Sequence, residues 1–152
     1  SAIKTFTQKV NWKDLDFIIV DMPPGTGDTQ LTFSQEIKMD GAIIVSTPQE
    51  VALLDVKRGI KMFDKLGVKI LGLVDNMSFF IGDDGKKYKI FGEGGVKKTA
   101  EEFEKKFLGE IPINPKVGEA GDNGKPIVEE NPDHEISKIY LEFANEIKST
   151  FF

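Results

Sequence analysis

The sequence predicts an α/β fold in which helices cover a mostly parallel sheet. Short apolar runs rich in β-branched residues carry this prediction, together with the amphipathic stripes that lie between them. The runs are continuous rather than alternating, which suits strands that are buried on both faces. They lie at residues 17–20, 42–45, 70–74 and 108–111. Because strand and helix patterns alternate, we expect right-handed crossovers between parallel strands, with ligands at the carboxyl ends of those strands.

Three helices are predicted from apolar residues that recur at spacings of three and four. Their stripes, which we interpret as core packing, are Leu53, Val56, Ile60 and Phe63; Val96, Ala100, Phe103 and Phe107; and Ile136, Ile139, Tyr140, Phe143 and Ile147. Gly67 is expected to end the first helix as its C-cap, and Asn131 with Pro132 is expected to begin the last. The single histidine, His134, is interpreted as a surface residue, because no second histidine could share a metal with it.

One segment interrupts the alternation of strands and helices. Residues 79–81 and 88–91 are apolar or aromatic in character, and they flank the sequence Gly-Asp-Asp-Gly at 82–85. This pattern predicts a β-hairpin inserted between the third strand and the next helix.

Size, charge and composition exclude several functional classes. The chain has 152 residues, so we treat 1–152 as a single domain. Its 20 basic and 25 acidic side chains give a net charge of −5, and no basic run exceeds two residues, which disfavours nucleic acid as a partner. The apolar runs are far too short to span a membrane. Cysteine is absent, which excludes disulfides and cysteine-held iron–sulfur clusters within this chain. We expect a cytoplasmic location.

The most informative motif follows the first strand. Residues 17–20 end in Asp21, which is followed by Met-Pro-Pro-Gly-Thr-Gly-Asp. A carboxylate in this place is typical of a Walker B aspartate, which holds magnesium through its water shell. Gly25 and Gly27 would let backbone amides approach a phosphate closely. A strand-ending aspartate alone is more often structural, whereas the whole string is specific.

A Walker B aspartate requires a P-loop, and the pattern Gly-x-x-x-x-Gly-Lys-Ser/Thr is absent from the sequence. The nearest match, at residues 92–99, has Lys97 where the pattern requires glycine. A side chain there would obstruct the wrap of the backbone around a phosphate. We therefore interpret residues 92–99 as a glycine-rich helix entry.

Several stretches, taken in order, resemble the Mrp/ApbC family of P-loop ATPases, which are related to MinD and the nitrogenase iron protein. These stretches are residues 21–28, 47–53, 72–78, 90–95, 109–112 and 121–126. The resemblance implies a three-layer, parallel-sheet, P-loop NTPase-like fold of the MinD and nitrogenase iron protein type, with a hairpin insertion near 79–91. It also implies an ATP-binding, ATP-hydrolysing iron–sulfur cluster carrier that works as a homodimer, uses ATP and magnesium, and serves iron–sulfur apo-proteins as clients.

The resemblance also implies roles for individual residues. Asp21 would be the catalytic Walker B carboxylate and would position magnesium through water, and Pro24 and Gly25 would belong to the loop that senses the γ-phosphate. Asn76 would hydrogen-bond the adenine edge, a role that suits an amide because it both donates and accepts. Taken alone, Asn76 would be interpreted as a turn residue at a strand end. The loop that closes over the base would consist of Pro112, Ile113 and Asn114.

Two departures from the family limit these expectations. The family P-loop lies well before the Walker B strand, whereas 16 residues precede Phe17 here. We therefore expect the fold to be incomplete at its N-terminus, the chain to be the C-terminal part of a longer protein, and this part alone not to hydrolyse ATP. Family members also commonly carry Cys-x-x-Cys in the hairpin turn, where this chain has Gly82 and Gly85. Aspartate oxygens are poor substitutes for cluster thiolates, so no iron–sulfur ligand is expected.

Two alternative functions remain open. The first is a non-catalytic nucleotide-binding or dimerisation module, which the missing cysteines favour. The second is a MinD-like or ParA-like ATPase that positions other components on a membrane or on DNA. It is less favoured, because acidic residues outnumber basic ones in the last predicted helix and leave it without a basic face.

Overall fold

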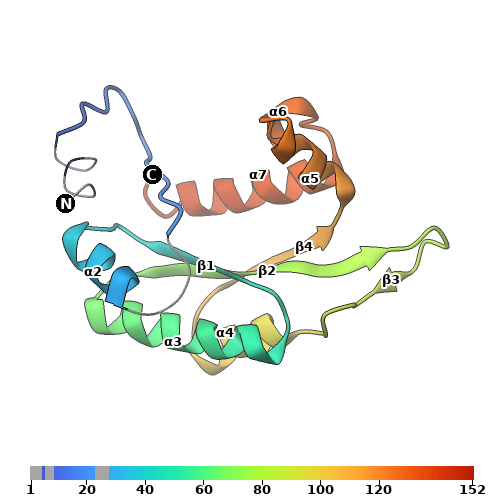
Figure 1. The fold of residues 1–152 in the computed structure, drawn as a ribbon, viewed down its shortest axis with the longest axis horizontal. Coiled ribbons are helices and arrows are strands. Elements are labelled where there is room, and N and C mark those ends of the chain that lie inside the picture. The colour runs from blue at the N-terminus through green and yellow to red at the C-terminus, as the bar shows by residue number, and fades with distance from the viewer. Residues whose placement is uncertain (1–4, 6–8, 23–27) are drawn as a thin grey trace.

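The computed structural model describes residues 5, 9–22 and 28–152. A four-stranded sheet lies at its centre, in which β1 and β4 run parallel to β2 and β3 pairs antiparallel with the far end of β2 (Figure 1). The strands are β1 (Ala42–Ser46), β2 (Ile70–Ile81), β3 (Lys87–Tyr88) and β4 (Phe107–Ile113). The parallel pairing of β1, β2 and β4 confirms the arrangement predicted from the alternating patterns.

Helices cover both faces of the sheet and form the two outer layers (Figure 1). One layer contains α3 (Glu50–Leu66) and α4 (Gly95–Glu102), with α2 (Asp28–Glu36) in contact with α3. The other layer contains α5 (Pro115–Asp122), α6 (Ile127–Glu130) and α7 (Glu135–Lys148). The predicted three-layer α/β architecture is therefore confirmed.

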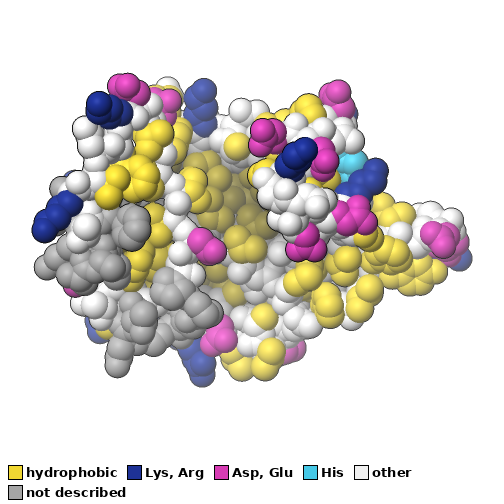
Figure 2. Space-filling view, turned by 45° about the horizontal axis from the view of Figure 1, so that its top comes forward, with side chains coloured by type: hydrophobic (Ala, Val, Ile, Leu, Met, Phe, Trp, Pro, Cys, Tyr) yellow, Lys and Arg dark blue, Asp and Glu magenta, His cyan; other side chains and the backbone are white. Residues whose placement is uncertain are grey.

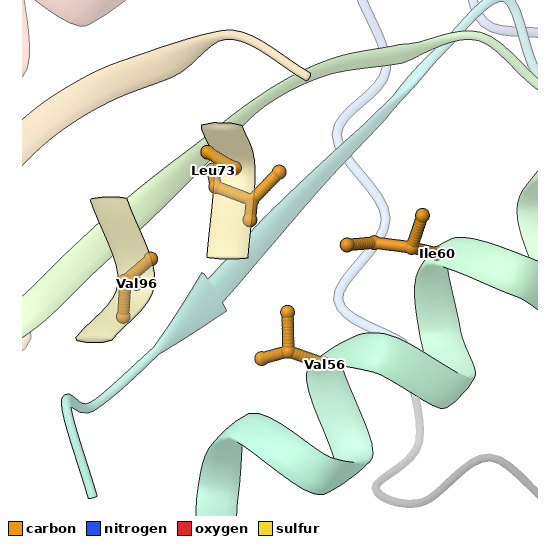
Figure 3. Close-up of a cluster of buried hydrophobic side chains, with 5 residues drawn as sticks. Val56, Ile60, Leu73 and Val96 are labelled. Carbon is orange, nitrogen blue, oxygen red and sulfur yellow. The ribbon is translucent and has the colours of Figure 1, made fainter. Parts of the chain in front are cut away.

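Neighbouring residues of β2 pack against opposite layers, because side chains alternate along a strand. Leu73 is fully buried in a cluster with Val56 and Ile60 of α3 and Val96 of α4, whose side chains converge in Figure 3. The cluster on the other face consists of Val74, Ile111, Ala120, Ile127 and Ile136. The predicted helical stripes thus supply the core on both sides of the sheet.

One helix end lies where the sequence predicted it, and two differ from the prediction. Gly67 follows α3 with φ of 69° and donates its N–H to Asp64 and Phe63, which confirms it as the C-cap. Phe107, assigned to a helical stripe, instead begins β4, because α4 ends at Glu102. The N-cap of α7 is His134 rather than an asparagine: its imidazole Nδ1 accepts from the N–H of Ile136 at 3.2 Å.

The strand predicted at residues 17–20 is wrong for this structure. These residues have no strand conformation, and their side chains are exposed, with Ile19 at 83%. Phe17 instead packs edge-on against the rings of Phe151 and Phe152, at centroid distances of 6.0 and 5.6 Å. A strand needs a neighbouring strand for its backbone groups, and residues 17–20 pair with none of the described strands. The face that carries residues 9–22 shows yellow hydrophobic side chains around a central hollow (Figure 2).

The predicted hairpin is confirmed, but its first arm is longer than expected and its second arm, β3, is shorter, since residues 89–91 are not strand. β2 runs without a break from the core into the hairpin, so the predicted third strand and the first hairpin arm are one strand. The turn closes through a hydrogen bond from the N–H of Gly82 to the carbonyl of Lys86. Gly85 adopts φ of 74°, a conformation that favours glycine. The ammonium of Lys87 lies 4.3 Å from the ring centre of Phe79 and fastens β3 to β2.

Candidate nucleotide-binding edge

The sequence-predicted residues of the base-binding site lie beside the carboxyl end of β4, next to the middle of β2, where its pairing with β1 ends. Asn76 pairs in register with Ile111, and Pro112 follows directly in β4. Pro112 is buried, whereas Asn76, Ile113 and Asn114 are partly exposed. The structure therefore brings these four candidates close to the carboxyl ends of β1 and β4, and a parallel α/β fold binds its ligands at such strand ends.

The side chain of Asn114 already has a structural partner. Its Oδ1 accepts from the N–H of Lys116 at 3.0 Å and caps the N-terminus of α5, which then begins with Pro115. An asparagine followed by proline is a favourable start to a helix. Asn114 can thus offer its backbone and its amide NH₂ group to a ligand, while its side-chain oxygen holds the helix.

A cavity of about 430 Å³ lies along the open edge of β1. Residues lining it include Met22, Ile43, Val45 and Asn76. Met22 thereby brings the end of the 9–22 segment to the cavity that Asn76 also reaches. Asp21, next to Met22, is exposed and does not line the cavity. The other two predicted residues of the phosphate loop, Pro24 and Gly25, lie outside the described residues.

A buried carboxylate, which the sequence analysis missed, precedes Asn76. The side chain of Asp75 is 1% exposed, and its Oδ1 has no hydrogen-bond partner among the described residues. Burial, reinforced by the charge of Glu110, raises the pKa of Asp75 to about 6, and the nearby ammonium of Lys89 opposes this rise. A charged residue inside the run Gly-Leu-Val-Asp-Asn was the available signal, because such a run otherwise predicts a buried strand.

The glycine-rich segment at residues 92–99 forms a helix entry, as predicted. α4 begins at Gly95, where an added Cβ would lie 2.8 Å from the carbonyl oxygen of Pro48, so the close approach of two backbones requires glycine. The hydroxyl of Thr99 donates to the carbonyl of Gly95 at 2.9 Å, inside the helix. Lys97 stands where a P-loop has glycine, so this segment does not match a P-loop.

The hairpin turn offers no ligands for an iron–sulfur cluster. Asp84 accepts hydrogen bonds from the N–H of Lys86 at 3.0 Å and from the hydroxyl of Tyr88 at 2.9 Å, and these bonds lower its pKa. Its oxygens therefore hold the turn together. No group of three or more metal-binding side chains occurs among the residues that the structure describes. The chain also contains no cysteine, so the residues present do not fit a cluster.

A family model described as ParA, NUBPL iron-transfer P-loop NTPase, matches residues 1–148. An iron–sulfur cluster carrier protein of Aquifex aeolicus is 45% identical over 144 residues, which are 94% of this chain and 40% of that protein. The chain thus spans less than half of the length of this curated relative.

Two solved structures share the fold. A nucleotide-binding protein of Archaeoglobus fulgidus, in complex with ADP, is 38% identical with a TM-score of 0.77, over 87% of this chain and 54% of that one. The septum site-determining protein MinD of Pyrococcus horikoshii, complexed with Mg-ADP, is 22% identical with a TM-score of 0.73, over 97% of this chain and 54% of that one. The second likeness concerns the fold alone, and together they confirm the predicted MinD-type fold.

Proposed function

Because the chain belongs to the family of NUBPL iron-transfer P-loop NTPases, we propose that it is part of an ATP-binding, ATP-hydrolysing protein that carries iron–sulfur clusters to apo-proteins. The likeness to the Aquifex carrier over almost the whole chain is the observation that carries this proposal. This chain would supply the adenine side of the nucleotide site. It would be the C-terminal part of an Mrp-like ATPase that acts as a homodimer in the cytoplasm. None of the described helices is both long and apolar enough to cross a membrane.

In this proposal Asn76 recognises the edge of the adenine base. Its amide can accept from the exocyclic amine of adenine and donate to a ring nitrogen at the same time. Pro112 and Ile113 would cover the base with apolar surface, and the backbone of Asn114 would complete the loop. The register between β2 and β4 supports this arrangement, since it pairs Asn76 with Ile111, the residue before Pro112.

Asp21, Pro24 and Gly25 would serve the phosphates of the nucleotide. Bound magnesium neutralises phosphate charge during hydrolysis. Asp21 would hold such an ion through a water molecule, and its exposed carboxylate is accessible for that contact. The residues of a P-loop are absent from the sequence, so we propose that this chain alone does not turn over ATP.

An iron–sulfur cluster is cargo in this function. Cluster thiolates would have to come from outside these residues, because the chain has no cysteine. The same observation favours the alternative of a non-catalytic nucleotide-binding or dimerisation module. The two functions differ in turnover: a carrier ATPase hydrolyses ATP once the P-loop portion is present, whereas a binding module does not.

Calorimetric titration with ADP and magnesium tests the nucleotide site. We expect Asn76→Ala to weaken ADP binding about tenfold, which is the loss expected for two hydrogen bonds to the base. Asn145→Ala, at an exposed position of α7, is the matched control and should bind as the unmodified chain does. Equal affinity in the two variants would remove Asn76 from the site.

A further inference from the structure

The ladder between β2 and β4 is interrupted next to Asn76. Asn76 pairs with Ile111 and Phe80 pairs with Ile113, so three residues of β2 stand opposite the single residue Pro112. Proline has no N–H to donate to a neighbouring strand, which accounts for the place of the interruption. β2 therefore bulges at residues 77–79, opposite Pro112.

Met77 is the first residue of the bulge and has a left-handed backbone conformation, with φ of 55°. Side chains other than glycine rarely adopt this conformation, and the surrounding structure must hold them in it. Two other described residues with positive φ, Asp14 and Glu104, are not glycines either, but both lie outside the strands. Met77 is thus a strained residue within a strand, and it directly follows the candidate adenine-binding residue.

The residues beyond Met77 fix the bulge in place. The buried hydroxyl of Ser78 donates to the carbonyl oxygen of Ile111 at 3.3 Å and bridges the two strands where proline cannot. Phe79, the last residue of the bulge, is 8% exposed, so burial of its ring holds that end of the bulge in place. The side chain of Met77 is itself 39% exposed. The Met77 side chain therefore contributes little to the core, and packing does not account for its left-handed backbone.

We propose that Met77 is a positioning residue, whose left-handed backbone opposite Pro112 fixes the direction of the Asn76 side chain at the rim of the cavity. This inference rests on the proposed recognition of adenine by Asn76. A left-handed residue that is held in place on both sides fixes the backbone of β2 next to Asn76, and with it the direction in which the Asn76 side chain leaves the strand. Glycine at the same place would relieve the strain and would allow other backbone conformations, so the amide of Asn76 would lose its fixed direction.

The test compares Met77→Gly with Met39→Gly in the full chain. Met39 is a partly buried residue whose φ lies outside the left-handed region, so the same substitution there removes packing without relieving strain. Three quantities are measured: the urea midpoint, the side-chain amide signals of Asn76 in ¹⁵N-edited NMR spectra, and the preference for ADP over IDP. IDP lacks the exocyclic amine that an asparagine would recognise.

For Met77→Gly we expect a urea midpoint equal to or above that of the unmodified chain, because glycine adopts positive φ without strain. The Asn76 amide signals should move toward those of the exposed Asn145. The preference for ADP over IDP should fall about threefold to tenfold, the equivalent of one or two hydrogen bonds. Met39→Gly should lower the urea midpoint and leave the Asn76 signals and the preference unchanged.

The inference is overturned if Met77→Gly lowers the urea midpoint as much as Met39→Gly does, or if the Asn76 signals do not move. If the unmodified chain shows no preference for ADP over IDP, the proposed adenine role of Asn76 fails. The positioning of Asn76 by Met77 is then still decided by the NMR signals and the urea midpoint, which require no nucleotide. A purely structural residue would change the midpoint without changing the Asn76 amide.

Discussion

Asp75 of β2 and Glu110 of β4 are direct partners in the parallel register, so both carboxylates face the same side of the sheet. Asp75 is almost fully buried, and Glu110 is one cause of its raised pKa, after burial. Two acidic groups side by side, one of them out of water, disfavour ionisation of the buried one. The stability of the chain should therefore depend on pH through Asp75.

The pKa of Asp75 is about 6 in the folded chain, against an ordinary value of 3.8. The folded state therefore binds this proton more tightly than the unfolded state, and stability falls as the pH rises from 3.8 to about 6. We expect Asp75→Asn to stabilise the chain above that range by about 3 kcal/mol, and to change its stability little at lower pH. Urea unfolding at several pH values measures the difference. Asp83→Asn, at an exposed position, is the control. If Asp75→Asn raised the free energy of unfolding equally at every pH, the raised pKa would not belong to Asp75.

Asp21 should be required for ATP hydrolysis once a P-loop is supplied. The measurement uses a chimera in which the preceding portion of the Aquifex carrier is joined to this chain. Asp21→Asn should reduce turnover by at least about tenfold without unfolding the protein, because magnesium loses its protein carboxylate. Asp16→Asn, an exposed aspartate of the same segment, should leave turnover unchanged. Full activity in the Asp21 variant would exclude this residue from the site.

Anaerobic reconstitution with iron and sulfide should give no cysteine-ligated cluster in this chain. A stable charge-transfer band with stoichiometric iron would disprove this expectation. Introducing cysteine at both Gly82 and Gly85 should create cluster binding if two copies bring their hairpins together.

Cysteines at Gly82 and Gly85 should destabilise the hairpin, so the experiment needs a matched control. Gly85 has φ of 74°, so cysteine is strained there, and a Cβ at Gly82 would lie 2.7 Å from the ring of Tyr88, which must shift. The doubly substituted chain should thus unfold at lower urea. Cysteines at Gly121 and Gly124 reproduce the spacing of the pair away from the hairpin. Cluster binding by this second variant would mean that the hairpin has no special role.

The isolated chain should either self-associate or be less stable than the roughly 5–15 kcal/mol of an ordinary domain. Residues 17–20 are exposed, and Val45 in β1 is 59% exposed. Exposed apolar strands invite pairing with another chain. Val45→Lys should then reduce association in sedimentation at micromolar concentration, while the exposed Leu141→Lys on α7 serves as control. A tight monomer of ordinary stability would show that the sheet edge needs no partner.

Periodicity predicted the parts of the fold that depend on a continuous core. The stripe that contains Val56 and Ile60 became α3, and the run that contains Leu73 became the central strand, because burial on both sides fixes such segments. Residues 17–20 have the same composition but no strand, since pairing depends on a neighbour that local sequence does not contain. Phe107 fits a helical spacing and nevertheless lies in β4, which shows that spacing alone does not mark where a helix ends.

The candidate site was predictable in its residues and not in its geometry. Asn76 and Pro112 belong to motifs with specific sequences, and parallel topology brings them together. The left-handed Met77 lies in a bulge opposite Pro112, which is 35 positions away in sequence, so no local pattern predicts this conformation. The raised pKa of Asp75 likewise depends on Glu110, which only the register places beside it.

The continuity of β2 from the core into the hairpin has a mechanical consequence. From Met77 to the turn at Asp83 the strand extends about 20 Å, at roughly 3.3 Å per residue. Because Ser78 ties the bulge to Ile111 and Phe80 pairs with Ile113 beyond it, the direction of the hairpin is set at the bulge. A change of about 10° in the direction of β2 there would displace the tip of the hairpin by about 3.5 Å, given that strand length. Loss of the left-handed conformation at Met77 would thus shift a part of the surface that no bound base touches.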